Sequence, residues 1–222
     1  MTICCAPCGA PAPHYYRVPR PLQPPELDGR PGEPARATLK HWVATCPQCG
    51  ASAPNLAALP AEAAAILRTE GYTALRAPGP AMPHLRWAYI CTALGNAAAA
   101  AEATLCAAWA LEDAGTSGDE LRRKAASLFQ PPANVAETLR VIDILRRAHA
   151  FAEAAALAGT IAPTDEAGQA ILAFQKARIA ARDAGRHQIS AAIRPPAHRP
   201  HVSHGKTAGG GLFGRIFGKK TG

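Results

Sequence analysis

Two short cysteine motifs constrain the fold of this chain more than any other feature. The pattern Cys-x-x-Cys-Gly occurs at residues 5–9 and again at residues 46–50. Two such pairs supply four thiolates, the ligand set of a closed tetrahedral zinc site with Zn–S bonds of about 2.3 Å. The glycine lets the backbone turn tightly around the metal, because it adopts positive φ at no steric cost. The sequence therefore predicts one structural Zn²⁺ ion held by Cys5, Cys8, Cys46 and Cys49.

The identity of the first ligand and the role of the pairs have alternatives. Cys4 directly precedes the first motif, so either Cys4 or Cys5 can serve as the first ligand. A redox dithiol is the competing interpretation, but it needs a thioredoxin-like βαβ context that the sequence lacks. Met1 leads into the cysteines without the charged and apolar regions of a secretory signal. Paired cysteine motifs without such a signal favour metal binding in a reducing compartment, so we expect a cytoplasmic protein.

Residues 1–58 are predicted to form a zinc-ribbon-like module with a proline-rich insert. Proline fixes φ and removes a backbone donor, so most of the insert between Cys8 and Cys46 should be loop. Two segments, 14–18 and 39–44, have the composition of short strands that could pair beside the metal. Closing a loop of this length costs about 3 kcal/mol, whereas structural zinc contributes roughly 10–16 kcal/mol. The metal should therefore order this module.

Residues 59–188 are predicted to form an antiparallel helical array. Trp87, Ile90 and Leu94 recur at helical spacing, and Gly95-Asn96 marks the end of their helix. Five further helices are expected. They end at about residue 114, span 119–129, run from Val135 through Leu145, span 149–162, and run from a cap at Asp165 to about Gln188. Small residues and alternating charges favour hairpins stacked like tetratricopeptide repeats. The fold class is thus mainly α, with a small β module.

Residues 189–222 are predicted to be a disordered basic tail, with six basic and no acidic side chains. His198, His201 and His204 are interpreted as solvated, and Gly205-Lys206-Thr207 lacks the first glycine and the helix of a phosphate-binding loop. Residues 209–222 include an apolar stripe beside basic residues, which could make a weak contact with an anionic membrane surface or a partner.

The combination of motifs resembles an uncharacterised bacterial family, domain of unknown function 2225. The resemblance rests on Cys46 to Gly50, on residues 105–109 and on Leu145-Arg146-Arg147 leading to residues 151–154. It covers roughly residues 1–188, although Ala51-Ser52 stands where the family tends to have an aromatic residue. The resemblance implies a metal site and a tetratricopeptide-like helical region, and it implies no activity.

Other side chains receive structural interpretations. Cys91 and Cys106 are expected to be small buried residues, and Trp87, Trp109 and Phe174 to fill the core. The arginines at 122–123 with Lys124, and at 146–147, are expected on solvated helix faces, with an acidic partner as the alternative. Residues 61–188 contain thirteen basic and thirteen acidic side chains, so a basic groove is not indicated.

These observations favour a non-enzymatic protein-interaction protein whose helical array binds another protein. The alternative is a nucleic-acid-associated regulator that uses the zinc ribbon and the basic tail. An enzyme is not favoured, because no nucleophile–histidine–carboxylate set can be assembled and a zinc with four sulfur ligands has no open position.

Overall fold

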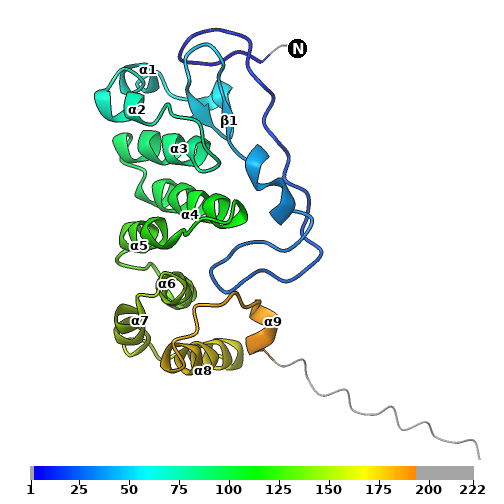
Figure 1. Cartoon of the computed structure of the whole chain (residues 1–222), viewed down its shortest axis with the longest axis vertical. Coiled ribbons are helices and arrows are strands. Elements are labelled where there is room, and N and C mark those ends of the chain that lie inside the picture. Colours follow the sequence, from blue (N-terminus) through cyan, green and yellow to red (C-terminus); the bar gives the residue numbers. More distant parts are fainter. Residues whose placement is uncertain (1–2, 194–222) are drawn as a thin grey trace, which may run out of the picture.

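The structure, a computed structural model, describes residues 3–193 and is mainly helical, with a two-stranded sheet near the N-terminus. The predicted fold class is confirmed. Figure 1 shows the helices as one column, with the N-terminal segment running beside it. The elements are η1 (Arg36–His41), β1 (Ala44–Thr45), β2 (Ser52–Ala53), η2 (Leu56–Ala58), α1 (Ala63–Ile66), α2 (Glu70–Ala74), α3 (Met82–Ala93), α4 (Ala97–Asp113), α5 (Asp119–Leu128), α6 (Val135–Arg147), α7 (Phe151–Ala158), α8 (Glu166–Ala180) and α9 (Ile189–Ala192).

Side-chain caps explain where several helices begin. Asn96 accepts a hydrogen bond from the backbone of Ala99 at 3.1 Å, Asn134 caps α6, and Asp165 accepts from Gly168 at 2.8 Å. Each of these bonds satisfies one of the donors that a helix start leaves free. The predicted boundary at Gly95-Asn96 is confirmed, because α3 ends at Ala93, Gly95 follows its C-cap residue with φ +73°, and α4 begins at Ala97.

Buried alanines on α3, α4, α5 and α7 let these helices pack closely on their neighbours. The middle core combines α4, α5 and α6 with η1, and Leu105, Trp109, Val141 and Ile144 are buried in it. On α4, Ala108 is completely buried, and a Cβ built on Gly118 would lie 3.2 Å from its Cβ. There is therefore no room for a larger side chain between α4 and the start of α5.

This close packing gives a testable prediction. Ala108→Leu should lower the free energy of unfolding by about 1–3 kcal/mol, because extra methylene groups force a packed core apart. Urea denaturation followed by circular dichroism would measure the change. Ala98→Leu is the matched control, since Ala98 lies on the same helix and is exposed. Equal stability of the two variants would contradict the packing argument.

Residues 11–43, which we call the strap, connect the two cysteine motifs. Figure 1 shows the strap running beside the helical column toward α6 and α9 before it returns through η1 to β1. At its far end, Leu27 donates a backbone hydrogen bond to His187 at 3.0 Å, and Ile189 donates to Pro25 at 2.9 Å. On the return, Leu39 of η1 is buried against α4. The strap therefore covers one face of the helical array.

Several predicted elements differ from the structure. Residues 14–18 form no strand, and Tyr15 and Tyr16 in this segment are exposed. Segment 39–44 instead contains the end of η1 and the start of β1, and β1 pairs with β2 across the second cysteine motif. The prolines at both ends of this segment, Pro13 and Pro19, explain the first error, because proline cannot donate to a ladder of backbone hydrogen bonds.

The C-terminal helix boundaries also differ. The helix predicted over 149–162 ends at Ala158, and the helix predicted to reach Gln188 ends at Ala180. Beyond α8, Arg146 donates hydrogen bonds to the carbonyl groups of Asp183 and Gly185, which hold the chain in a bend. The short helix α9 lies inside the segment predicted to be disordered, and the rest of that tail lies outside the described residues.

Within residues 3–193, none of the helices combines the length and the apolar character needed to cross a bilayer.

Candidate metal centre

Four cysteine sulfurs converge at the N-terminal end of the structure. The Sγ atoms of Cys5, Cys8, Cys46 and Cys49 all lie within 4.8 Å of one another. Two of the separations, Cys5 to Cys49 and Cys8 to Cys46, are 3.7 Å. A tetrahedron of sulfurs about 2.3 Å from a central ion has edges of about 3.8 Å. A disulfide would need about 2.05 Å, so this spacing suits a metal centre.

The two cysteine motifs build the same local structure. In each motif, the first cysteine donates its backbone N–H to the residue after the glycine, with Cys5 to Ala10 at 2.9 Å and Cys46 to Ala51 at 2.8 Å. In both turns, the glycine N–H donates a hydrogen bond to the carbonyl of the first cysteine. Gly9 and Gly50 have φ values of +70° and +76°. A side chain with a Cβ would be strained there, which explains the shared glycine.

The structure distinguishes Cys4 from Cys5. Each cysteine turn lies between two residues that pair in antiparallel β fashion, seven positions apart. These pairs are Cys4 with Pro11 and Thr45 with Ser52. Cys4 therefore occupies the place that Thr45 holds in the second turn, and its side chain is exposed. The sulfur of Cys5 belongs to the cluster, whereas that of Cys4 does not.

Burial opposes ionisation of the cysteine thiols, whereas backbone donors in the turns favour it. Burial and the neighbouring thiols raise the pKa of Cys5. Burial also acts to raise the pKa of Cys46, but the backbone N–H groups of Cys49 and Gln48 outweigh it and lower that pKa to about 7. A cation at the centre would favour the deprotonated form of all four groups. The donor set and its surroundings therefore fit a metal ion with a preference for sulfur.

The cysteine cluster is attached firmly to the helical array. Tyr72 of α2 is fully buried and donates its hydroxyl to the carbonyl of Gly50 at 2.8 Å. Ala6 donates to the carbonyl of Leu56 at 3.1 Å. Around these contacts lies an apolar core that joins Cys5 and Cys46 to residues of η2, α1, α2 and α3. An ion at the cluster would therefore order the first part of the array as well as the two turns.

Comparison with known proteins gives no relative: no family model, no curated protein and no solved structure matches the chain. The resemblance to domain of unknown function 2225 is thus unconfirmed.

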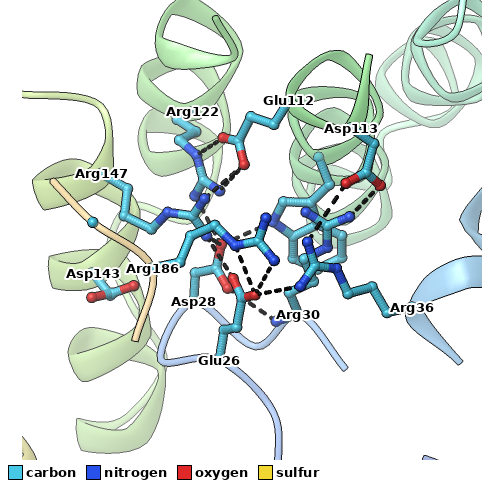
Figure 2. Close-up of polar contacts among 12 residues, drawn as sticks. Glu26, Asp28, Arg30, Arg36, Glu112, Asp113, Arg122, Asp143, Arg147 and Arg186 are labelled. Carbon is cyan, nitrogen blue, oxygen red and sulfur yellow. Dashed lines mark hydrogen bonds and ion pairs between the residues drawn. The ribbon is translucent and has the colours of Figure 1, made fainter. Parts of the chain in front are cut away.

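A second polar cluster lies where the strap meets α4, α5 and α6. Sequence analysis placed Arg122, Arg146 and Arg147 on solvated faces, and this was wrong, because all three are buried. Arg123 and Lys124 are exposed, as expected. Figure 2 shows Glu26 and Asp28 of the strap pointing into a group of arginines, together with acidic residues of α4. Arg122 and Arg147 are therefore bound by acidic residues of the strap and α4, whereas Arg146 pairs with Asp143 of its own helix at 2.8 Å.

Asp28 is the centre of this second cluster. Its side chain is 0% exposed, and its Oδ2 accepts hydrogen bonds at 2.9 Å from Trp109, Arg122 and Arg147. Burial acts to raise the pKa of Asp28, but the two guanidinium groups lower it to about 2. Arg122 and Arg147 each also bind Glu112. Asp28 is therefore a buried carboxylate that stays charged.

Glu26 extends the cluster toward the C-terminal end of the array. It accepts from Arg147 at 2.8 Å through one oxygen, and from Arg186 at 3.1 Å and Arg36 at 3.3 Å through the other. The backbone carbonyl of Asp28 also accepts from Arg140 at 2.6 Å. Sequence analysis missed both acidic residues of the strap, which stand in a segment interpreted as loop. The sequence pattern that could have indicated them is Glu-Leu-Asp-Gly-Arg at residues 26–30, which is apolar only at Leu27.

The remaining candidate residues are mostly buried or half-buried side chains. Trp109 is buried, while Trp87 and Phe174 are half-buried. Cys91 is buried, and Cys106 and His84 line one apolar cavity of about 370 Å³. Burial raises the pKa of Cys106 to about 12 and lowers that of His84 to about 4. A nucleophilic pair needs a thiolate, so this neutral thiol lacks the required character.

Proposed function

We propose that this chain is a non-enzymatic, zinc-stabilised interaction protein. Four thiolates, from Cys5, Cys8, Cys46 and Cys49, would hold one structural Zn²⁺ ion. The observation that carries the proposal is the 3.7 Å separation of sulfurs from different motifs, which matches a tetrahedral edge. Free thiols of this kind require a reducing compartment, which supports a cytoplasmic location.

The donor set supports a structural role for the ion. A catalytic zinc keeps one position open for water or substrate, whereas four sulfurs fill a tetrahedral site. The ion would join residues separated by 38 positions, from Cys8 to Cys46, and so close the strap into a loop. Its role would be to hold that loop against the helices.

The helical array supports the interaction role. Helices α3–α8 pack mainly on their neighbours in sequence, with a further contact between α6 and α8. We interpret them as a degenerate tetratricopeptide-like array that offers an extended surface. The resemblance to domain of unknown function 2225 is part of this proposal. The alternative, a nucleic-acid-associated regulator, finds less support, because the buried arginines of α5 and α6 are bound by carboxylates. Contacts of residues 209–222 with a membrane or a partner lie outside the described residues.

Metal analysis tests the first part of the proposal. The purified chain should contain about one zinc per molecule, and X-ray absorption should find a shell of four sulfurs at about 2.3 Å. Cys46→Ser/Cys49→Ser should lose the metal, while Cys4→Ser should retain it. A folded wild-type chain without any metal would contradict the proposal.

Affinity purification of the same three proteins from the native cell tests the second part. A specific protein should be recovered with the wild-type chain and with Cys4→Ser, and its recovery should fall sharply with the double variant. Recovery of identical proteins with all three, or of nucleic acid in place of protein, would exclude this interaction role.

A further inference from the structure

The turn at the far end of the strap is a compact element that carries two carboxylates. Gly29 donates to the carbonyl of Glu26 at 2.9 Å, and Glu26 donates to the carbonyl of Arg30 at 2.8 Å. Asp28 accepts from the backbone of Arg30 at 3.1 Å. Gly29 has φ +87°, so the turn requires glycine at this position. Because these bonds lie within five consecutive residues, the turn has the form of a short folded peptide.

The helices present a site that is complementary to this turn. Donors from α4, α5 and α6 (Trp109, Arg122 and Arg147) meet at one oxygen of Asp28. Arg140 approaches so closely that a Cβ on Gly29 would lie 2.6 Å from its Nε. Charged donors on a carboxylate are among the strongest hydrogen bonds in proteins. The site therefore has both the charge and the shape to bind an acidic turn.

Ionic contacts, together with backbone hydrogen bonds to residues 187 and 189, attach the turn to this site. Residues 13–25 before it are exposed except for half-buried Pro19, and Leu22 is 85% exposed. Within the turn, Leu27 is the one apolar side chain, and it is buried. A long exposed segment followed by an ionic contact resembles a ligand on a tether more than a core strand. Such a tether keeps the local concentration of the turn at the site high, without any contact of its own.

Removing the turn would leave the guanidinium groups without enough counter-charge. Arg122 and Arg147 would share the carboxylate of Glu112, and Arg140 would retain Glu102. Buried arginines that lose their partner are strongly destabilising. Another carboxylate-bearing peptide would relieve this cost in the same place.

We infer that the arginine site beneath the strap binds an acidic peptide of a partner protein, and that residues 26–30 occupy it as an intramolecular ligand. This inference rests on the proposed interaction function and specifies its partner. The partner segment carries two carboxylates two residues apart on a tight turn, like Glu26 and Asp28. Binding of the partner and docking of the strap then exclude each other.

The test uses the full chain and a fluorescent peptide with the sequence of residues 20–34. Glu26→Gln/Asp28→Asn removes both intramolecular carboxylates and preserves side-chain size. The variant should bind the peptide with a Kd at least tenfold lower than wild type does, and the affinity should fall with added salt. Saturating peptide should also raise the Tm of the variant, because a ligand of the native state stabilises it.

Matched controls separate this site from general charge effects. Glu62→Gln/Glu70→Gln removes two exposed carboxylates elsewhere and should bind the peptide no better than wild type. A peptide with glutamine and asparagine at positions 26 and 28 should not bind the first variant. If that variant binds the acidic peptide no more tightly than wild type does, the inference is wrong.

Hydrogen exchange of wild-type protein decides the question even if the double variant fails to fold. Excess acidic peptide should increase exchange at residues 22–30 at least tenfold, with α4–α6 unchanged. If the peptide leaves hydrogen exchange at the turn unchanged, the strap is a permanent part of the core and the inference is wrong. The zinc content of each sample is measured in parallel, so a missing metal would overturn the proposed zinc site independently of peptide binding.

Discussion

Replacing Cys46 and Cys49 together by serine is expected to unfold the N-terminal part of the protein. Structural zinc contributes roughly 10–16 kcal/mol, which is comparable with the entire stability of a typical domain. If the chain loses even about 4 kcal/mol, its Tm should fall by about 8–16 °C, because a domain of this size shifts about 2–4 °C per kcal/mol. Differential scanning calorimetry would measure the shift.

The loss should be local before it is global. Hydrogen exchange should increase first in the cysteine turns, the strap and η2, which depend on the metal for their closure. Protection in α6–α8 should persist, because their core contains Leu139, Ile142 and Leu172 and is separate from the cysteine cluster. Cys4→Ser is the matched control and should behave as wild type. Unchanged Tm and unchanged exchange in Cys46→Ser/Cys49→Ser would exclude a structural metal.

Asp28→Asn should cause the second-largest effect. The substitution keeps the shape of the side chain but leaves Arg122 and Arg147 without their central anion. Breaking one side of a buried ion pair costs about 3–5 kcal/mol, so we expect a Tm about 6–20 °C lower. Asp119→Asn is the control, because Asp119 and its partner His149 are 31% and 57% exposed, and such pairs contribute about 1 kcal/mol or less.

Acid titration gives this prediction an independent readout. Burial acts to raise the pKa of Asp28, but Arg122 and Arg147 lower it to about 2, below its usual value of 3.8. The native state therefore binds this proton less readily than the unfolded state does, and stability decreases as the pH falls from about 4 toward 2. The Asn variant lacks this carboxyl group, so its stability should fall less over that range. Equal slopes for wild type and variant would contradict a charged Asp28.

Local chemistry explains which features could be predicted from sequence. The cysteine turns follow from ligand type, spacing and a glycine at positive φ, all within five consecutive residues. Helix starts at Asn96 and Asp165 follow from side chains that satisfy nearby backbone donors. The convergence of the two cysteine motifs was also predictable, because four thiols of matched spacing favour a single site.

The amino-acid sequence by itself determined the cysteine turns, the helical class and most helix starts, because these depend on neighbours a few residues away. The path of the strap and the burial of Arg122 and Arg147 were decided by tertiary structure alone. A guanidinium group is solvated by default, and it is buried only where a carboxylate arrives to neutralise it. Here that carboxylate belongs to Asp28, 94 residues from Arg122 and on a segment with no regular structure, so no local pattern records the pairing.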